Sequence, residues 1–126
     1  KGYASHVMEA IVTNTPCELG GNVLNTGHLL TNLPEDACVE VPCLVNGQGI
    51  HPCHVGRLPV QCAAMNMTNI NPQLMTIEAA LTRKRENIYQ AAMLDPHTAA
   101  QLSVDEIVSL CDDLIEAHGD YMKDYR

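Results

Sequence analysis

The sequence predicts an α+β fold, in which a small antiparallel sheet with a β-hairpin is packed by several helices. The chain begins with helical spacing of apolar residues from Tyr3, continues with a strand-like alternation around an Asn-Gly pair, and becomes helical after Pro59. Its 126 residues fit one domain. We expect residues 1–122 to form that domain, with residues 123–126 as a tail.

The first predicted helix is carried by "YASHVMEAIV", with apolar residues at Tyr3, Val7 and Ile11. Residues before a proline avoid the helical region, so this helix should end between Thr13 and Pro16. Gly20-Gly21 then opens an extended section that contains a turn signal at Asn25-Thr26-Gly27.

The segment "CVEVPCLV" alternates apolar and polar residues, which is typical of a strand with one buried face. Pro42 has no N–H to donate, so we expect an edge strand or a bulged strand. Asn46-Gly47 predicts a hairpin with these two residues at the turn. This turn would place Val45 opposite Gln48.

The same predicted register raises the possibility of a metal site. Glu40 would lie opposite Cys53 and Pro42 opposite His51, so one face would carry Cys38, Glu40, His51 and Cys53. Zinc accepts these ligand types. However, residues two apart on a strand are separated by about 7 Å, which suits packing better than chelation. We therefore predict no metal ligand in the chain and keep a small metal-binding domain as an alternative.

The remaining chain predicts helices. A short helix should begin at Pro59, and Asn71-Pro72 should start a second helix of about twenty residues that Asp95-Pro96 ends. Ser103 and Glu106 form a capping box for the last helix, and Gly119 is a stop signal.

Composition excludes several classes of partner. Fifteen acidic residues against seven basic ones give a net charge of −8, which disfavours nucleic acid. We interpret Arg83-Lys84-Arg85 as the solvated face of a helix. No apolar run is long enough for a membrane span. The six cysteines lie within regular patterns, which favours reduced thiols and a cytoplasmic location.

The chain contains no dinucleotide fingerprint, nucleophile elbow, Walker loop or His-Glu-x-x-His motif. Asp112, Asp113 and Glu116 are interpreted as the solvated face of a helix rather than as paired catalytic carboxylates. We therefore predict no catalytic residue and no cofactor-binding residue here. The sequence suggests a part of an enzyme rather than all of one.

Four spaced motifs occur in order: "NLPEDACVEVP" at residues 32–42, "VGRLP" at 55–59, "AAMLDP" at 91–96, and "DEIVSLCDDLIEAHGD" at 105–120. Together they resemble the C-terminal region of glycoside hydrolase family 4, and most closely its α-galactosidase branch. The similarity extends from about Tyr3 to Met122. The resemblance implies the C-terminal domain of a lactate-dehydrogenase-like glycosidase.

Enzymes of this family use NAD and a divalent metal, commonly manganese, instead of two carboxylates. The resemblance implies that hydride leaves C3 of an α-galactoside or a related α-glycoside, a base takes the C2 proton, and the glycosidic oxygen is eliminated. It places the cofactor and metal ligands upstream, in a Rossmann-type domain. A carbohydrate substrate, a homo-oligomer and an inactive isolated segment are then expected. The alternative is a structural or oligomerisation module without activity.

The candidates for contact with a sugar are Asn22, Asn25 and Asn32, because amides donate to and accept from hydroxyl groups. The alternative is that these asparagines set turns and cap strands. The surrounding loop departs from the family pattern, with His28 where an aliphatic residue is common and Gly20-Gly21-Asn22 in place of Asn-Gly-Asn.

Overall fold

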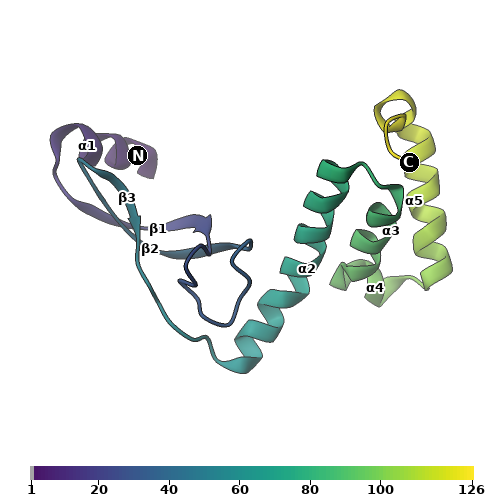
Figure 1. Cartoon of the computed structure of the whole chain (residues 1–126), viewed down its shortest axis with the longest axis horizontal. Coiled ribbons are helices and arrows are strands. Elements are labelled where there is room, and N and C mark those ends of the chain that lie inside the picture. The colour runs from purple at the N-terminus through teal and green to yellow at the C-terminus, as the bar shows by residue number, and fades with distance from the viewer. Residues whose placement is uncertain (1) are drawn as a thin grey trace. The chain divides into compact units, whose positions relative to one another are not determined.

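The computed structural model describes residues 2–126, which form two compact units (Figure 1). The residues up to Pro59 form the sheet unit, and Val60–Arg126 form the helical unit. Lys1, the first residue of the predicted domain, lies outside the described residues. The α+β class is confirmed, with a three-stranded antiparallel sheet in the first unit and four α-helices in the second.

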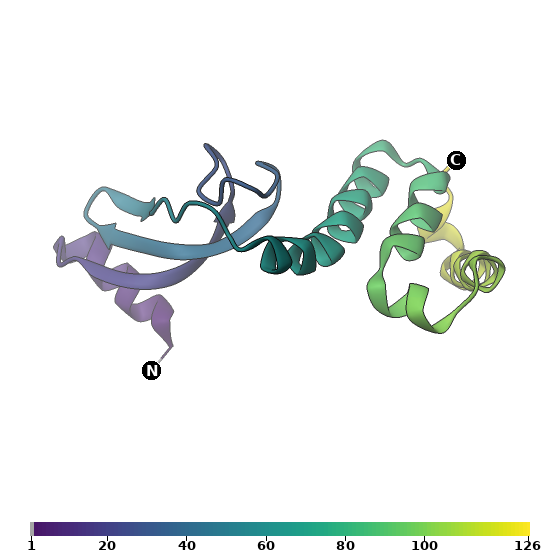
Figure 2. The ribbon, with the colours of Figure 1, turned by 90° about the horizontal axis from the view of Figure 1, so that it is seen from below.

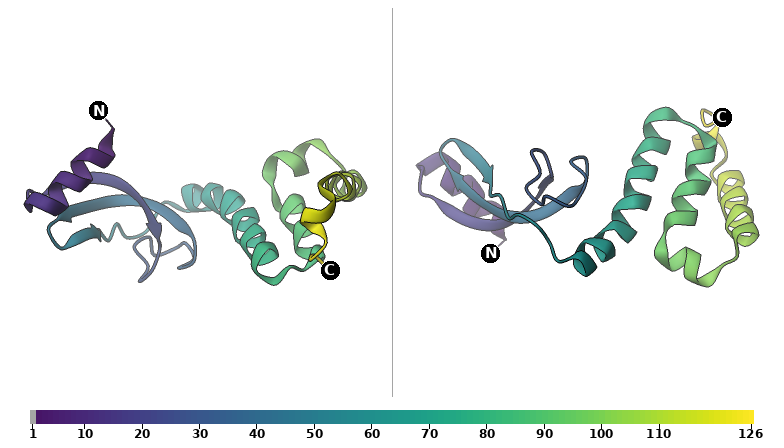
Figure 3. Two further views of the ribbon diagram at one scale, coloured as in Figure 1. Left: turned by 90° about the horizontal axis from the view of Figure 1, so that it is seen from above. Right: turned by 60° about the horizontal axis from the view of Figure 1, so that its bottom comes forward.

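The sheet unit contains α1 (Tyr3–Thr13), β1 (Cys17–Leu24), β2 (Cys38–Asn46) and β3 (Gly49–Pro52). The strands lie in the order β1-β2-β3. Alternate residues of β2 are buried, and α1 packs against this strand across one face of the sheet (Figure 3). The core of the unit includes Ala10 and the buried row Val39, Val41, Cys43 and Val45.

Contrary to the expectation of an edge or bulged strand, β2 is the central strand. Pro42 is tolerated there because of the direction of its backbone groups. The Cys53 N–H donates to the Pro42 carbonyl at 2.8 Å, so the polar groups of Pro42 point toward the β3 side. Another residue at position 42 would point its N–H in the same direction, to a place just past the end of β3. The missing N–H of Pro42 therefore removes no hydrogen bond from the pairing of β1 with β2.

The hairpin is confirmed, but its predicted register is wrong by two residues. Gly47 and Gln48 form the turn, Asn46 pairs with Gly49, and Val45 pairs with Ile50. A long-range contact joins this turn to the end of α1: the Asn14 side chain accepts a hydrogen bond from the Gly47 N–H at 2.8 Å. A Cβ at position 47 would lie 2.8 Å from this oxygen, so a larger residue there would have to displace the Asn14 side chain. A shift of two residues keeps every side chain on its predicted face.

The helical unit contains α2 (Val60–Thr82), α3 (Arg85–Leu94), α4 (Pro96–Gln101), α5 (Val104–His118) and the 3₁₀ turn η1 (Gly119–Met122). The predicted break at Asn71-Pro72 is wrong, because α2 continues through Pro72. Proline inside a helix removes one hydrogen bond and bends the axis without necessarily ending the helix. The axis of α2 changes direction part-way along (Figure 2).

The predicted helix from Asn71 to Asp95 is divided in two. Arg83 adopts a left-handed conformation with φ of 58°, which ends α2, and α3 begins at Arg85. The interpretation of Arg83-Lys84-Arg85 as a helical face is therefore wrong for the first two residues, which connect the helices. The break is held by residues expected to form a tail: the Arg85 N–H donates to the Arg126 carbonyl at 2.7 Å, and the Arg126 N–H donates to the Arg83 carbonyl at 3.0 Å.

The start and stop signals of the later helices are confirmed. Ser103 and Glu106 form the predicted capping box of α5, and Gly119 ends this helix with a φ of 52°. Asp95 caps α4 by accepting from the Thr98 N–H. Among the helices of the described residues, none is long and apolar enough to cross a membrane.

Candidate functional site

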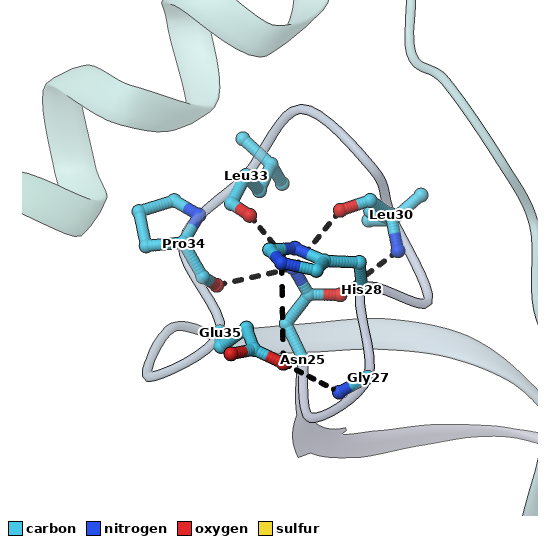
Figure 4. Close-up of polar contacts among 7 residues, drawn as sticks. All are labelled: Asn25, Gly27, His28, Leu30, Leu33, Pro34 and Glu35. Carbon is cyan, nitrogen blue, oxygen red and sulfur yellow. Dashed lines mark hydrogen bonds and ion pairs between the residues drawn. The ribbon is translucent and has the colours of Figure 1, made fainter.

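The segment between β1 and β2, residues 25–37, is organised around the side chain of Asn25 and is called the Asn25 loop. Asn25 is fully buried. Its Nδ2 donates to the carbonyls of Leu30 and Leu33, both at 2.9 Å, and of Pro34 at 3.1 Å. Its Oδ1 accepts from the Leu30 N–H at 2.8 Å (Figure 4). One side chain thereby binds four backbone groups of the loop, of which the Leu30 and Pro34 carbonyls also accept from the Leu33 and Ala37 N–H groups, each at 3.3 Å.

The ends of the Asn25 loop are joined as well, since the Asn25 N–H donates to the Ala37 carbonyl at 2.9 Å. Because the amide of Asn25 is engaged on both its nitrogen and its oxygen, it is not directed toward an external ligand. Its role in this structure is to fix the path of the loop.

Asn32 attaches the Asn25 loop to the segment that leads out of the sheet unit. Its Nδ2 donates to the Leu58 carbonyl at 2.9 Å, and its Oδ1 accepts from the Leu58 N–H at 3.0 Å. The same two segments are joined by the Thr31 N–H, which donates to the Gly56 carbonyl at 3.0 Å. The amide of Asn32 therefore also binds the protein's own backbone. This agrees with the alternative that the asparagines set turns and cap strands.

Asn22 is placed differently, on the exposed face of β1 opposite Glu40. It lines a hollow between α1 and the sheet, together with Gly20 and Gly21. A Cβ at Gly20 would lie 2.8 Å from Glu40 Oε1, so the glycine leaves room for this carboxylate. The three candidates thus do not converge on one point, and their contact with a sugar stays a prediction.

The rim of the Asn25 loop carries His28 and Glu35. His28 has a positive φ of 54°, and its Nε2 lies 4.0 Å from Glu35 Oε1 (Figure 4). The same carboxylate oxygen accepts from the Gly27 N–H at 2.9 Å. Both side chains of the pair are more than half exposed. An exposed pair of this kind contributes little to stability, and it places an imidazole and a carboxylate at the surface of the loop.

The hairpin carries its ligand-type residues on the predicted exposed face, but they do not gather. Within residues 2–126, no group of three or more His, Cys, Asp and Glu side chains could hold a metal ion. His51 instead lies with its Nε2 3.1 Å from Asn46 Oδ1. All six cysteines are free thiols. Burial raises the pKa of the Cys111 thiol, as expected of a small apolar core residue.

Three carboxylates of the helical unit accept hydrogen bonds from neighbouring groups of the same unit. Tyr89 donates its hydroxyl to Asp112 at 2.5 Å, which links α3 to α5 and raises the pKa of Tyr89. Hydrogen bonds from the Ser103 N–H and hydroxyl lower the pKa of Glu106. Hydrogen bonds from the Thr98 N–H and hydroxyl lower the pKa of Asp95. Each shift has a structural cause, and none of these carboxylates is paired with another as an acid and base would be.

Sequence reasoning missed Asn14, which ends α1 in a left-handed conformation and binds the hairpin turn. An asparagine directly after a helix suggests a left-handed end, but its contact with Gly47 has no local signal.

The family model described as family 4 glycosyl hydrolase C-terminal domain matches residues 1–98. The chain belongs to glycosyl hydrolase family 4. The α-galactosidase of Bacillus subtilis (strain 168) is 60% identical over 126 residues, which are 100% of this chain and 29% of that protein. The α-galactosidase of Rhizobium meliloti (strain 1021) is 32% identical over 98% of this chain and 25% of that protein. The family 4 chain thus spans less than a third of the length of these relatives.

Solved structures of glycosidases resemble the chain as well. A 6-phospho-α-glucosidase from gut microorganisms, in complex with NAD and glucose-6-phosphate, has a TM-score of 0.80 and 27% identity over 91% of this chain and 26% of that one. The 6-phospho-β-glucosidase of Thermotoga maritima, crystallised with manganese, NAD+ and glucose-6-phosphate, has a TM-score of 0.78 and 24% identity over 94% of this chain and 29% of that one. The similarity to the Thermotoga maritima enzyme shows a shared fold. The resemblance of the four motifs to this family of glycosidases is confirmed.

Proposed function

We propose that the chain is the C-terminal part of an NAD- and manganese-dependent glycosidase that cleaves α-galactosides, or related α-glycosides, by redox elimination. The observation that carries this proposal is 60% identity with an α-galactosidase across the whole chain. The cofactors are supported by NAD and Mn²⁺ in structures of family members. The residues that hold them belong, in this proposal, to an upstream Rossmann-type domain.

In the parent enzyme, the sheet unit would help to close the sugar cleft. Asn22 is the candidate to reach the substrate, because its side chain is exposed beside a hollow. Asn25 and Asn32 would act by positioning, since their amides already bind backbone groups. We also propose a cytoplasmic location, which the six free thiols support.

The cofactor requirement can be tested by assaying a chromogenic α-galactoside with NAD+, Mn²⁺ and a thiol reductant. The chain alone should give no turnover, and the longer enzyme should lose activity when either cofactor is removed. Turnover by the chain alone, or activity of the longer enzyme without NAD+, would contradict the proposal. A chromogenic α-glucoside assayed in parallel distinguishes the sugar.

The role of Asn22 can be tested by Asn22→Ala in the longer enzyme, with Asn69→Ala on an exposed face of α2 as the matched control. We expect the first variant to raise KM for the galactoside and the control to leave it unchanged. The second candidate function is a structural and oligomerisation module, favoured by the internal use of the Asn25 and Asn32 amides. It predicts the same KM for both variants.

A further inference from the structure

Asn46 is followed by glycine in the turn between β2 and β3, and no other asparagine of the sequence precedes a glycine. Asn46 is half-buried, and Gly47 is exposed. The backbone nitrogen of the residue after an asparagine can attack the side-chain amide carbon, Cγ, and close a five-membered ring. Glycine has no Cβ and therefore hinders this approach least. Asn46 and Gly47 are thus the pair of residues in this sequence that is most open to cyclisation.

The side-chain carbonyl of Asn46 is held and polarised by two groups. Its Oδ1 accepts from the Gln48 N–H at 2.8 Å, a bond that folds the side chain over the peptide of Gly47. The same Oδ1 lies 3.1 Å from His51 Nε2, and this nitrogen is the donor because an amide oxygen can only accept. Negative charge would develop on Oδ1 if a nucleophile added to Cγ. Two donors directed at this oxygen would stabilise such an adduct, as in an oxyanion hole.

The backbone nitrogen that would attack is held by Asn14. The Gly47 N–H donates to Asn14 Oδ1 at 2.8 Å. Attack requires this nitrogen to give up its proton to water, so a hydrogen bond that already occupies the proton slows the step. Asn14 ends α1 in a left-handed conformation and is exposed. The hydrogen bond therefore lies at the surface, where water competes for the Gly47 N–H and the bond can open.

We propose that Asn46 is a deamidation site, at which the Gly47 nitrogen cyclises onto Cγ while Asn14 restrains the reaction and His51 promotes it. The Gly47 nitrogen loses its proton to water and forms a bond to Cγ, and the bond between Cγ and Nδ2 breaks. Nδ2 takes up a proton and leaves as ammonia. Water then opens the succinimide ring at either of its carbonyl carbons, which gives aspartate or isoaspartate. The reaction needs no oxidant or reductant, because no atom changes its oxidation state.

The products would alter the hairpin in two ways. A carboxylate replaces a neutral amide, which adds one negative charge to a chain with a net charge of −8. In isoaspartate the backbone runs through the former side chain and gains one methylene group. Asn46 pairs with Gly49 beside the turn, so the added group would displace this end of the pairing between β2 and β3. None of these steps involves the proposed glycosidase chemistry.

The proposal can be tested by incubating the longer enzyme that contains this chain in warm, mildly alkaline buffer, followed by peptide mapping with chromatography and mass spectrometry. Aspartate and isoaspartate should accumulate at position 46 faster than at Asn69, which is exposed and followed by isoleucine.

Substitutions of Asn14 and His51 test their separate roles. Asn14→Gly permits the left-handed conformation without the amide and should speed the reaction about fivefold, which corresponds to about 1 kcal/mol in the barrier. Asn14→Asp keeps an acceptor for the Gly47 N–H and should keep the slow rate. His51→Ala removes one donor to Asn46 Oδ1 and should slow the reaction about threefold.

Matched controls are Thr15→Ala, at the exposed position next to Asn14, and His54→Ala, at an exposed histidine beyond the end of β3. Both controls should leave the rate unchanged. Accumulation at position 46 no faster than at Asn69 would overturn the proposal. So would equal rates for Asn14→Gly and Asn14→Asp, or for His51→Ala and its control. These outcomes leave the glycosidase proposal intact, since loss of cofactor-dependent turnover tests that separately.

Discussion

The two units keep their irregular segments in place by different means. In the sheet unit, the path of the Asn25 loop depends on one fully buried amide that binds four backbone groups. In the helical unit, the starts of α4 and α5 rely on caps nearer the surface, from the half-buried Asp95 and from the exposed Ser103 and Glu106. A buried polar group left without a partner costs more than an exposed cap that water can replace. The loop should therefore be sensitive to single substitutions, and the helical unit tolerant of them.

The largest effect is expected for Asn25→Ala. The substitution removes the Asn25 partner of the Leu33 carbonyl and of the Leu30 N–H in a buried site, while the Leu30 carbonyl keeps the Leu33 N–H at 3.3 Å. We expect a loss of about 3–5 kcal/mol in the free energy of unfolding, measured by urea denaturation. Asn22→Ala, at an exposed strand position, is the control and should change stability by less than about 0.5 kcal/mol. Similar losses in the free energy of unfolding for the two variants would show that the buried amide of Asn25 matters no more for stability than the exposed side chain of Asn22.

Asn32→Ala should have the next largest effect, about 1–2 kcal/mol, because it breaks two hydrogen bonds to Leu58 in a half-buried site. The loss should be local. Hydrogen exchange would show faster exchange of the Leu58 amide and unchanged exchange in α5. Unchanged exchange at Leu58 would mean that Asn32 does not anchor the loop.

A smaller effect is expected in the helical unit, where Ser103→Ala removes the N-cap of α5. Thermal unfolding should report a loss of about 1 kcal/mol. Ser109→Ala, in the exposed middle of the same helix, should be neutral or slightly stabilising, since alanine has the higher helix propensity. If both serines gave equal losses, the capping box would not be the source of the effect.

The smallest effect concerns pH. The pKa values of Glu106 and Asp95 are lowered by their cap hydrogen bonds, below the ordinary values of 4.5 and 3.8. A lowered folded-state pKa contributes stability that is present above the ordinary pKa and lost as the pH falls through the folded-state pKa. Helicity should therefore decline between about pH 5 and about pH 2. Glu106→Gln should flatten this decline, and an unchanged profile would show that Glu106 has no part in it.

Local signals predicted the elements, and long-range contacts decided their details. The capping box at Ser103 and the stop at Gly119 follow from neighbouring residues alone. The turn at Gly47 and the break at Arg83 are hydrogen-bonded to Asn14 and Arg126, which are distant in sequence. Continuity of α2 through Pro72 likewise has no local signal, and α2 packs along α3.

The candidate site shows the same limit. The Asn25-Thr26-Gly27 turn signal identified the start of the loop, and amide chemistry identified the asparagines. Their direction could not be predicted, because the partners of Asn25 lie five to nine residues ahead and that of Asn32 lies at Leu58. The sequence pattern cannot tell an amide that binds a sugar from one that binds a carbonyl.

We have proposed that this chain is the C-terminal part of an enzyme that works by redox elimination. The most direct measurement is cleavage of an α-galactoside in D₂O by the longer enzyme that contains this chain, with NAD+ and Mn²⁺ present. Removal of the C2 proton and its replacement from solvent should give galactose that carries deuterium at C2, detected by NMR. Galactose with hydrogen retained at C2 would contradict the account.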